Sequence, residues 1–113
     1  MKTKKPVPKV RDKMSRTHAL KVAKHIADTL RAHGATKVLL FGSLATEDYD
    51  PEYSDIDIYH EGIPLLEIIH AEVMATWDTN LEDDTGRRRV DLVHWLTINK
   101  KLKKHILATG VPI

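Results

Sequence analysis

Two short stretches carry most of the information in this sequence: KVLLFGS at residues 37–43 and DIDIY at residues 55–59. The first is a continuous apolar run that ends at Gly42, which is typical of a buried strand followed by a turn. The second alternates acidic and apolar residues with a period of two, which predicts another strand. The sequence therefore predicts a β-sheet that carries a Gly-Ser turn and an acidic pair.

Segments with helical periodicity flank these strands. One follows Ser15 and ends at Gly34, with apolar residues three and four positions apart. Another follows the Gly-Ile-Pro sequence at residues 62–64, which interrupts regular secondary structure, and its apolar residues have the same kind of spacing. They are Leu66, Ile69, Val73 and Trp77. We expect these four to mark the inward face of a helix, and we expect Trp77 and Trp95 to belong to the core.

The rest of the chain predicts a third strand and a last helix. Residues 89–95 alternate apolar side chains with Asp91, and the apolar residues that follow recur every four positions up to Gly110. The predicted order is α-β-β-α-β-α. This order indicates an α+β fold in which helices pack on one face of a small mixed β-sheet.

Composition limits the class of protein. The chain has 113 residues, of which 42% are hydrophobic and 30% charged, and this suits one folded domain. No apolar run approaches the ~20 residues of a membrane span. The absence of cysteine excludes disulfides, Cys-based zinc sites and thiol nucleophiles. We expect a cytoplasmic protein that has no membrane partner.

Basic charge is concentrated at the start of the chain. Residues 1–13 hold six Lys or Arg against one Asp, a local charge of +5, which leaves −3 for the other residues because the formal net charge is +2. We predict a flexible basic tail over residues 1–14 and a folded domain over residues 15–113. The sequence pI of 8.9 then reflects the tail, so we expect no direct nucleic-acid binding by the domain.

Acidic residues on two predicted strands point to a cation site. Asp55 and Asp57 are two positions apart, so both project from one face of the sheet while Ile56 and Ile58 project from the other. Alternation on the third strand adds Asp91 to the acidic face. Three neighbouring carboxylates repel one another unless a cation lies among them, and all-oxygen sites suit Mg²⁺.

The Gly-Ser pair at the end of the first strand suits a phosphate. Gly42 allows the backbone to approach a ligand closely, and Ser43 offers a hydroxyl and N–H groups to phosphate oxygens. A Gly-Ser pair alone is usually an ordinary turn. Together with the three acids it indicates a metal-assisted phosphate site.

This combination resembles the nucleotidyltransferase superfamily of the DNA polymerase β type. In its short length the chain resembles the minimal nucleotidyltransferase (MNT) branch of this superfamily, the antitoxins of HEPN/MNT toxin–antitoxin systems. The resemblance spans roughly residues 22–110 and implies a polymerase β-like nucleotidyltransferase fold. It also implies nucleotidyl transfer from ATP with two Mg²⁺ ions.

The resemblance assigns a role to each residue of the motif. It implies that Asp55 and Asp57 hold Mg²⁺ on the triphosphate, and that Gly42 and Ser43 grip the β- and γ-phosphates. Asp91 would complete the second metal site and help to deprotonate the acceptor hydroxyl. All three acids are present, which favours an active enzyme over a decayed one.

The resemblance also implies a partner. A chain this short leaves little surface for an acceptor, so a HEPN ribonuclease toxin would complete the site in a hetero-oligomer. The function implied is antitoxin-type protein adenylylation, with AMP transferred to a hydroxyl of the toxin, expected to be a tyrosine. Two alternatives stay open: a non-catalytic antitoxin that binds through its acidic loop, and a small-molecule nucleotidyltransferase that homodimerises.

Two features depart from the family pattern. The spacer between the Gly-Ser pair and Asp55 holds eleven residues where ten are common, and no Arg follows Ser43. The spacer is also acidic between Glu47 and Glu52, which opposes a triphosphate unless cations offset it.

Arg89 could reach a phosphate or pair with an acid. The spacing of the histidines predicts no zinc site.

Overall fold

The computed structural model describes residues 13–77, 79 and 89–113. Most of the predicted basic tail, most of the polar loop at residues 79–86, and Arg87 lie outside the described residues. The helices are α1 (Arg16–Ala32), η1 (Ser43–Ala45), η2 (Leu65–Glu67), α2 (Ile68–Thr76) and α3 (Lys100–Thr109). The strands are β1 (Lys37–Phe41), β2 (Ile56–Glu61), β3 (Val90–His94) and β4 (Val111–Pro112).

The four strands form one mixed sheet in the order β3-β2-β1-β4. β1 pairs with β2 and with β4 in antiparallel fashion, whereas β2 and β3 are parallel. The predicted α+β fold with a small mixed sheet is therefore confirmed. Strand β4 was not predicted, because two residues are too few to show a periodic pattern. Pro112 is tolerated there because β4 is an edge strand of the sheet.

Helix α1 follows its sequence signals closely. The Ser15 side chain accepts a hydrogen bond from the backbone N–H of His18 at 3.1 Å, which caps the first turn. The buried side of the helix consists of small and branched side chains: Ala19, Ala23, Ile26, Ala27 and Leu30. Gly34 follows with a φ of 111°, a conformation that suits glycine and ends the helix.

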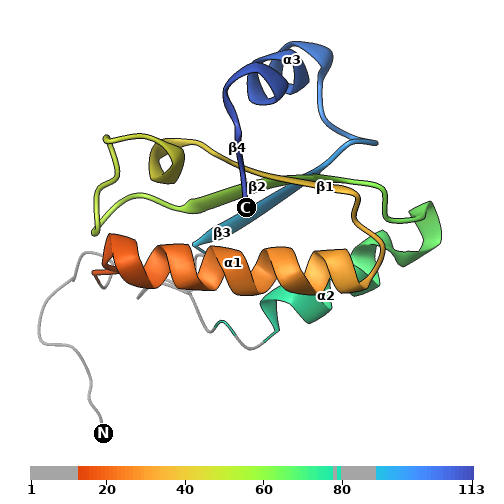
Figure 1. Cartoon of the computed structure of the whole chain (residues 1–113), viewed down its shortest axis with the longest axis horizontal. Helices are drawn as coiled ribbons and strands as arrows, with labels where there is room; N and C mark the ends of the chain where they lie inside the picture. Colours follow the sequence, from red (N-terminus) through yellow and green to blue (C-terminus); the bar gives the residue numbers. More distant parts are fainter. Residues whose placement is uncertain (1–12, 78, 80–88) are drawn as a thin grey trace, which may run out of the picture.

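The helices lie on both faces of the sheet (Figure 1). α1 and α2 cover the face that carries Leu40, Ile56 and Ile58, and α3 covers the opposite face, where Ile106 packs against Leu39 and Tyr59. The expectation that all helices share one face therefore needs correction for α3. The reason is that β1 and β2 also bury Leu39 and Tyr59 on the second face, so that face needs a cover as well.

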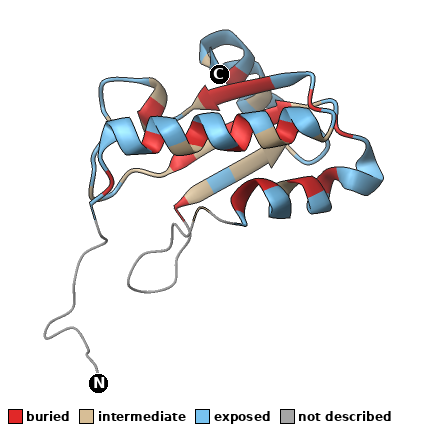
Figure 2. Cartoon of the chain, turned by 60° about the horizontal axis from the view of Figure 1, so that its bottom comes forward, coloured by how far each residue is buried: buried red, intermediate tan, exposed pale blue. Residues whose placement is uncertain are grey.

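Helix α2 turns the predicted apolar face outward (Figure 2). Leu66 is 92% exposed, Ile69 78% and Trp77 77%, while Trp95 is 40% exposed. The predictions that this stripe faces inward and that both tryptophans belong to the core were wrong. The buried residues of α2 are Ile68, Ala71, Ala75 and Thr76. Small side chains fit here because α2 packs closely against the alanine-rich side of α1.

Within the part of the chain that the structure describes, no helix is both long and apolar enough to cross a membrane.

Candidate active site

The end of β1 brings the Gly-Ser turn against an acidic side chain of β2. Gly42 has a φ of 74° and starts the 3₁₀ helix η1, and a Cβ atom at this position would lie 2.2 Å from Oδ2 of Asp57. Only glycine fits, because the Asp57 carboxylate occupies the space of a side chain and the backbone has a conformation that L-residues rarely adopt. The predicted neighbours Gly42 and Asp57 are therefore in direct contact.

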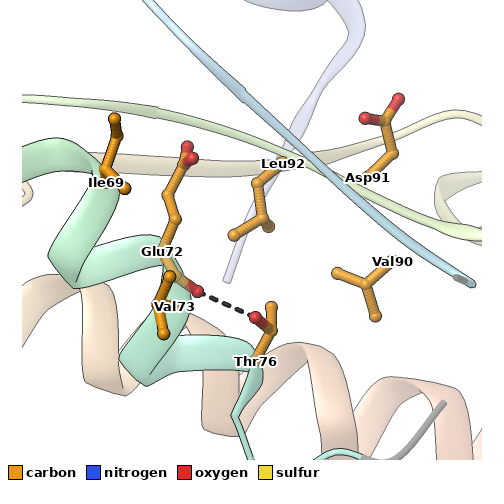
Figure 3. A pocket seen from close by; sticks show the side chains of 7 residues that line it. All are labelled: Ile69, Glu72, Val73, Thr76, Val90, Asp91 and Leu92. Atoms are coloured by element: carbon orange, nitrogen blue, oxygen red, sulfur yellow. Dashed lines mark hydrogen bonds between the residues drawn. The ribbon is translucent and has the colours of Figure 1, made fainter.

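Two of the three predicted acids lie side by side. Asp57 is paired in register with Asp91 on the parallel neighbour β3 and with Phe41 on the antiparallel neighbour β1. Strands in register present paired side chains on the same face, about 4.8 Å apart at the backbone. Asp57 is half-buried and Asp91 is exposed. In Figure 3 the carboxylate of Asp91 points away from Val90 and Leu92, as the alternation predicts.

The third predicted acid lies just before β2. Asp55 is half-buried and stands two positions before Asp57. Among residues 13–77, 79 and 89–113, no group of three or more His, Cys, Asp or Glu side chains is arranged to hold one metal ion. The described residues thus bring together the pair Asp57 and Asp91 but not a complete three-acid cage.

This donor set still fits magnesium at a phosphate site. Mg²⁺ usually binds through one or two carboxylates and keeps its other positions for water and substrate phosphates. Asp57 and Asp91 supply two carboxylates in register, one of them exposed, beside the Gly-Ser turn. The geometry therefore suits an ion that arrives with a nucleotide better than a resident structural ion.

The turn that holds Ser43 is anchored by a buried side chain and by hydrogen bonds from α1. Leu44 is fully buried in the core shared by α1 and the sheet. The guanidinium of Arg16 donates to the backbone oxygen of Thr46 at 2.7 Å and to that of Leu44 at 3.0 Å. The Thr46 hydroxyl donates in turn to the backbone oxygen of Ser43 at 3.0 Å. These contacts hold the Gly-Ser backbone in one position, as a phosphate cradle requires.

Arg89 stabilises the same loop from the other end. Its side chain is buried, and Nη2 donates to the backbone oxygens of Ser54 at 2.6 Å and Pro51 at 3.2 Å. The sequence left open whether Arg89 reaches a phosphate or pairs with an acid. The structure gives it backbone oxygens as partners just before Asp55, so it positions the start of β2.

A hollow of about 420 Å³ opens beside the Gly-Ser turn. Its lining from the turn and the following loop includes Gly42, Ser43 and Asp48, and its lining from α3 is His105 and Thr109. The sequence analysis missed these two α3 residues. Their spacing of four positions places them on one helix face, but only the packing of α3 on the second face of the sheet brings that face to Ser43.

The charges around the hollow are mixed. Asp48 belongs to the acidic spacer that the sequence analysis flagged as unfavourable for a triphosphate. Across the hollow, α3 has the sequence KKLKKHILAT and carries four lysines besides His105. The basic helix therefore offsets the acidic spacer in part, which favours an anionic ligand at this position.

Tyr59 lies on the same face of the sheet as Asp57, but its side chain is buried and cannot reach a ligand. Its ring is fully buried in the cluster with Ile106, and its hydroxyl donates to the Glu61 carboxylate. Burial, together with this hydrogen bond, raises the pKa of Tyr59 well above its usual value. Tyr59 therefore stays neutral and is a structural part of the floor under α3.

Comparisons with known proteins agree on the fold. Residues 24–113 match the family described as polymerase beta, nucleotidyltransferase. A solved structure of a minimal nucleotidyltransferase superposes with a TM-score of 0.66 at 21% identity, covering 88% of this chain and 97% of the other. No match was found among curated proteins.

Two further solved structures are similar. The complex of the tri-AMPylated HEPN toxin of Shewanella oneidensis with its MNT antitoxin gives a TM-score of 0.53 at 19% identity, covering 83% of this chain and 70% of the other. A nucleotidyltransferase from Sulfolobus solfataricus gives 0.52 at 23% identity, with 86% and 80% covered. These likenesses show the fold.

Proposed function

We propose, from the premise that this chain belongs to the polymerase β nucleotidyltransferase family, that it transfers AMP from ATP to a hydroxyl of a partner protein. The observation that carries the proposal is the contact between the Asp57 carboxylate and the backbone of Gly42. A carboxylate, the kind of group that binds Mg²⁺, thus lies directly beside a turn of the kind that binds phosphate. Asp91 in register on β3 adds the second carboxylate.

Each residue has a role that follows from its position. Ser43 lines the hollow, and its backbone N–H and hydroxyl would bind the β- and γ-phosphates. Asp57, Asp91 and Asp55 would hold Mg²⁺, which neutralises phosphate charge and activates the acceptor hydroxyl. The exposed carboxylate of Asp91 can accept the hydroxyl proton.

The bond changes balance without another reactant. The acceptor oxygen forms a bond to the α-phosphorus of ATP while the bond between that phosphorus and the bridging oxygen breaks. The products are an adenylylated hydroxyl and pyrophosphate, and the hydroxyl proton leaves through the base. A hollow of about 420 Å³ lies within the usual range of ligand pockets, so a nucleotide has room.

The partner we propose is a HEPN ribonuclease toxin, with a tyrosine as the acceptor. Support comes from the fold shared with the complex of a tri-AMPylated HEPN toxin and an MNT antitoxin. An adenylyl group adds negative charge, which would repel RNA phosphate from the toxin.

Intact-mass spectrometry of a HEPN protein encoded beside this chain tests the proposal. After incubation with this chain, ATP and Mg²⁺, the HEPN protein should gain one or more AMP units. Asp57→Asn and the exposed variant Asp91→Asn should each reduce the rate at least about 100-fold, as expected for loss of a metal ligand. Asp28→Asn, a surface carboxylate on α1 that pairs with Lys24, is the matched control.

A second candidate function is neutralisation by binding alone. It is favoured by the lack of a complete three-acid cage among the described residues, and by the acidic spacer. It predicts that toxicity is suppressed without ATP and that suppression survives Asp55→Asn. A stable complex with no change in mass would support this function and contradict adenylylation.

A further inference from the structure

An apolar surface on α2 is not used by the fold or by the candidate active site. It consists of six side chains from η2, α2 and the residue after it, which we call the α2 stripe: Leu65, Leu66, Ile69, Val73, Met74 and Trp77. Each is at least 44% exposed. Isolated surface leucines are common, but a continuous stripe that includes a tryptophan is typical of a contact surface.

Contacts between α2 and the core keep the α2 stripe on the outer side of the helix. On the opposite side of α2, Ala71 and Ala75 are fully buried against the core. Nε2 of His60 on β2 and Oε2 of Glu72 lie 2.7 Å apart, which ties the helix to the sheet. The helix therefore cannot roll over to bury the stripe without exposing these residues and breaking this contact.

We infer that the α2 stripe is the contact surface between two copies of this chain, related by a two-fold axis near the middle of α2. The spacing of the stripe supports a second copy as the occupant. Leu66 and Trp77 lie at equal distances from a point between residues 71 and 72, and so do Ile69 and Met74. An antiparallel pair of α2 helices would therefore bring these four residues together in two apolar pairs, as a two-fold contact requires.

The relief of the surface supports the same occupant. A hollow of about 270 Å³ lies between α2 and β3 (Figure 3), and four apolar and three polar side chains line it: Ile69, Val73, Val90, Leu92, Glu72, Thr76 and Asp91. Ile69 and Val73 thus form both the wall of the hollow and part of the stripe. Such a surface carries a ridge and a groove side by side, so that each copy can place its ridge in the groove of the other.

Area and charge agree with a modest dimer. Each exposed side chain of this size offers roughly 100 Å², so the stripe offers on the order of 600 Å². A stable interface needs about 800 Å² from each partner, and the hollow beside β3 extends the surface toward that value. The six residues of the stripe carry no charge; Glu67 and His70 are exposed beside it, and half-buried Glu72 lines the hollow together with Asp91.

The test does not depend on adenylylation, because it changes only residues of α2 and the residue after it, although Asp91 of the candidate active site lines the hollow beside β3. Sedimentation velocity of the full chain over a range of concentrations tests it. We expect a monomer–dimer equilibrium. Ile69→Ser and Trp77→Ser should each raise the dimer Kd about 100-fold, since each change occurs twice across the axis.

Leu20→Ser is the matched control, because Leu20 is exposed on α1 and lies outside the stripe. It should leave the Kd unchanged. Circular dichroism melts verify that all variants fold. A wild-type chain that stays monomeric at every concentration would overturn the inference, and so would a dimer that persists in both stripe variants. In the first case the stripe would serve a different protein.

The absence of cysteine permits a geometric test. Val73→Cys introduces a single thiol within two residues of the proposed axis, so that its two copies lie near each other across the axis. Mild oxidation should join two chains by a disulfide, because their Cα atoms would be within bridging range. Leu20→Cys should not form this product. Equal cross-linking of the two variants would contradict a two-fold axis at α2.

Discussion

Strand β2, which lies beside the corner where β1 ends, and helix α2 both carry apolar residues at regular spacing. The spacing predicts which side chains face the core in β2 but not in α2. In β2, each side chain has two possible faces, and Ile56 and Ile58 occupy one of them, so Asp57 takes the other. In α2, two sets of apolar residues compete for the inward side, and the set with the smaller side chains is buried. Spacing alone thus predicts a face for a strand, whereas an evenly apolar helix needs its neighbours to be known.

The largest difference between the two regions should appear in stability. Leu44 in η1 is fully buried, so Leu44→Ala should lower the free energy of unfolding by about 3 kcal/mol through the cavity that it leaves. Urea denaturation measures this loss. Leu20→Ala on the exposed side of α1 should change stability by less than about 0.5 kcal/mol. Equal effects of the two changes would mean that η1 is not anchored in the core.

A second prediction isolates the carboxylate contact at the corner. Gly42→Ala should destabilise the fold by about 1–2 kcal/mol through backbone strain and should displace Asp57 as well, because the new Cβ would meet Oδ2. Gly34→Ala has a similar positive φ, but its Cβ would come no closer than 3.6 Å to Pro64. Nucleotidyl transfer, measured by release of labelled pyrophosphate, should fall at least about 100-fold in the first variant only.

Retained transfer in Gly42→Ala would show that Asp57 does not need its present position. Loss of transfer in both glycine variants would point to backbone strain in general. The comparison therefore separates a metal-binding role of the corner from a merely structural one.

The elements nearest the motif could be predicted because their signals are local. The strand at residues 37–41 was predicted with its observed bounds, and Ser15 and Gly34 bound the first helix as expected. β2 runs two residues beyond the predicted end at Tyr59, because Tyr59 and His60 are buried and remain paired with β1. Alternation had marked the strand but not its length.

The parts that could not be predicted depend on contacts between distant segments. Which face of α2 is buried depends on its packing against the alanine-rich side of α1. The arrival of His105 at the hollow depends on α3 covering the second face of the sheet, which the sequence order left open. The burial of Arg89 under the spacer is of the same kind, because its partners are about 35 residues away along the chain.

A third prediction concerns the floor under α3. The pKa of Tyr59 is raised in the folded state, so folding favours its neutral form, and its contribution to stability is complete below the ordinary pKa of 10.0. As the pH rises one unit above 10.0, the wild type should lose up to about 1.4 kcal/mol that Tyr59→Phe does not lose. Urea denaturation of both proteins at pH 9 and pH 11 measures the difference, and parallel losses would contradict a buried neutral tyrosine.

The smallest expected effect belongs to the α2 stripe and depends on concentration. In dilute solution, Ile69→Ser should change the free energy of unfolding by less than about 0.5 kcal/mol, because its side chain is in water. At concentrations well above the dimer Kd, the wild type gains stability by mass action while the variant does not. Thermal melts at two concentrations should therefore diverge for the wild type and coincide for Ile69→Ser. Leu44→Ala should differ from the wild type at both concentrations, because a buried anchor acts within one chain, whereas a contact surface acts only when a second chain is present.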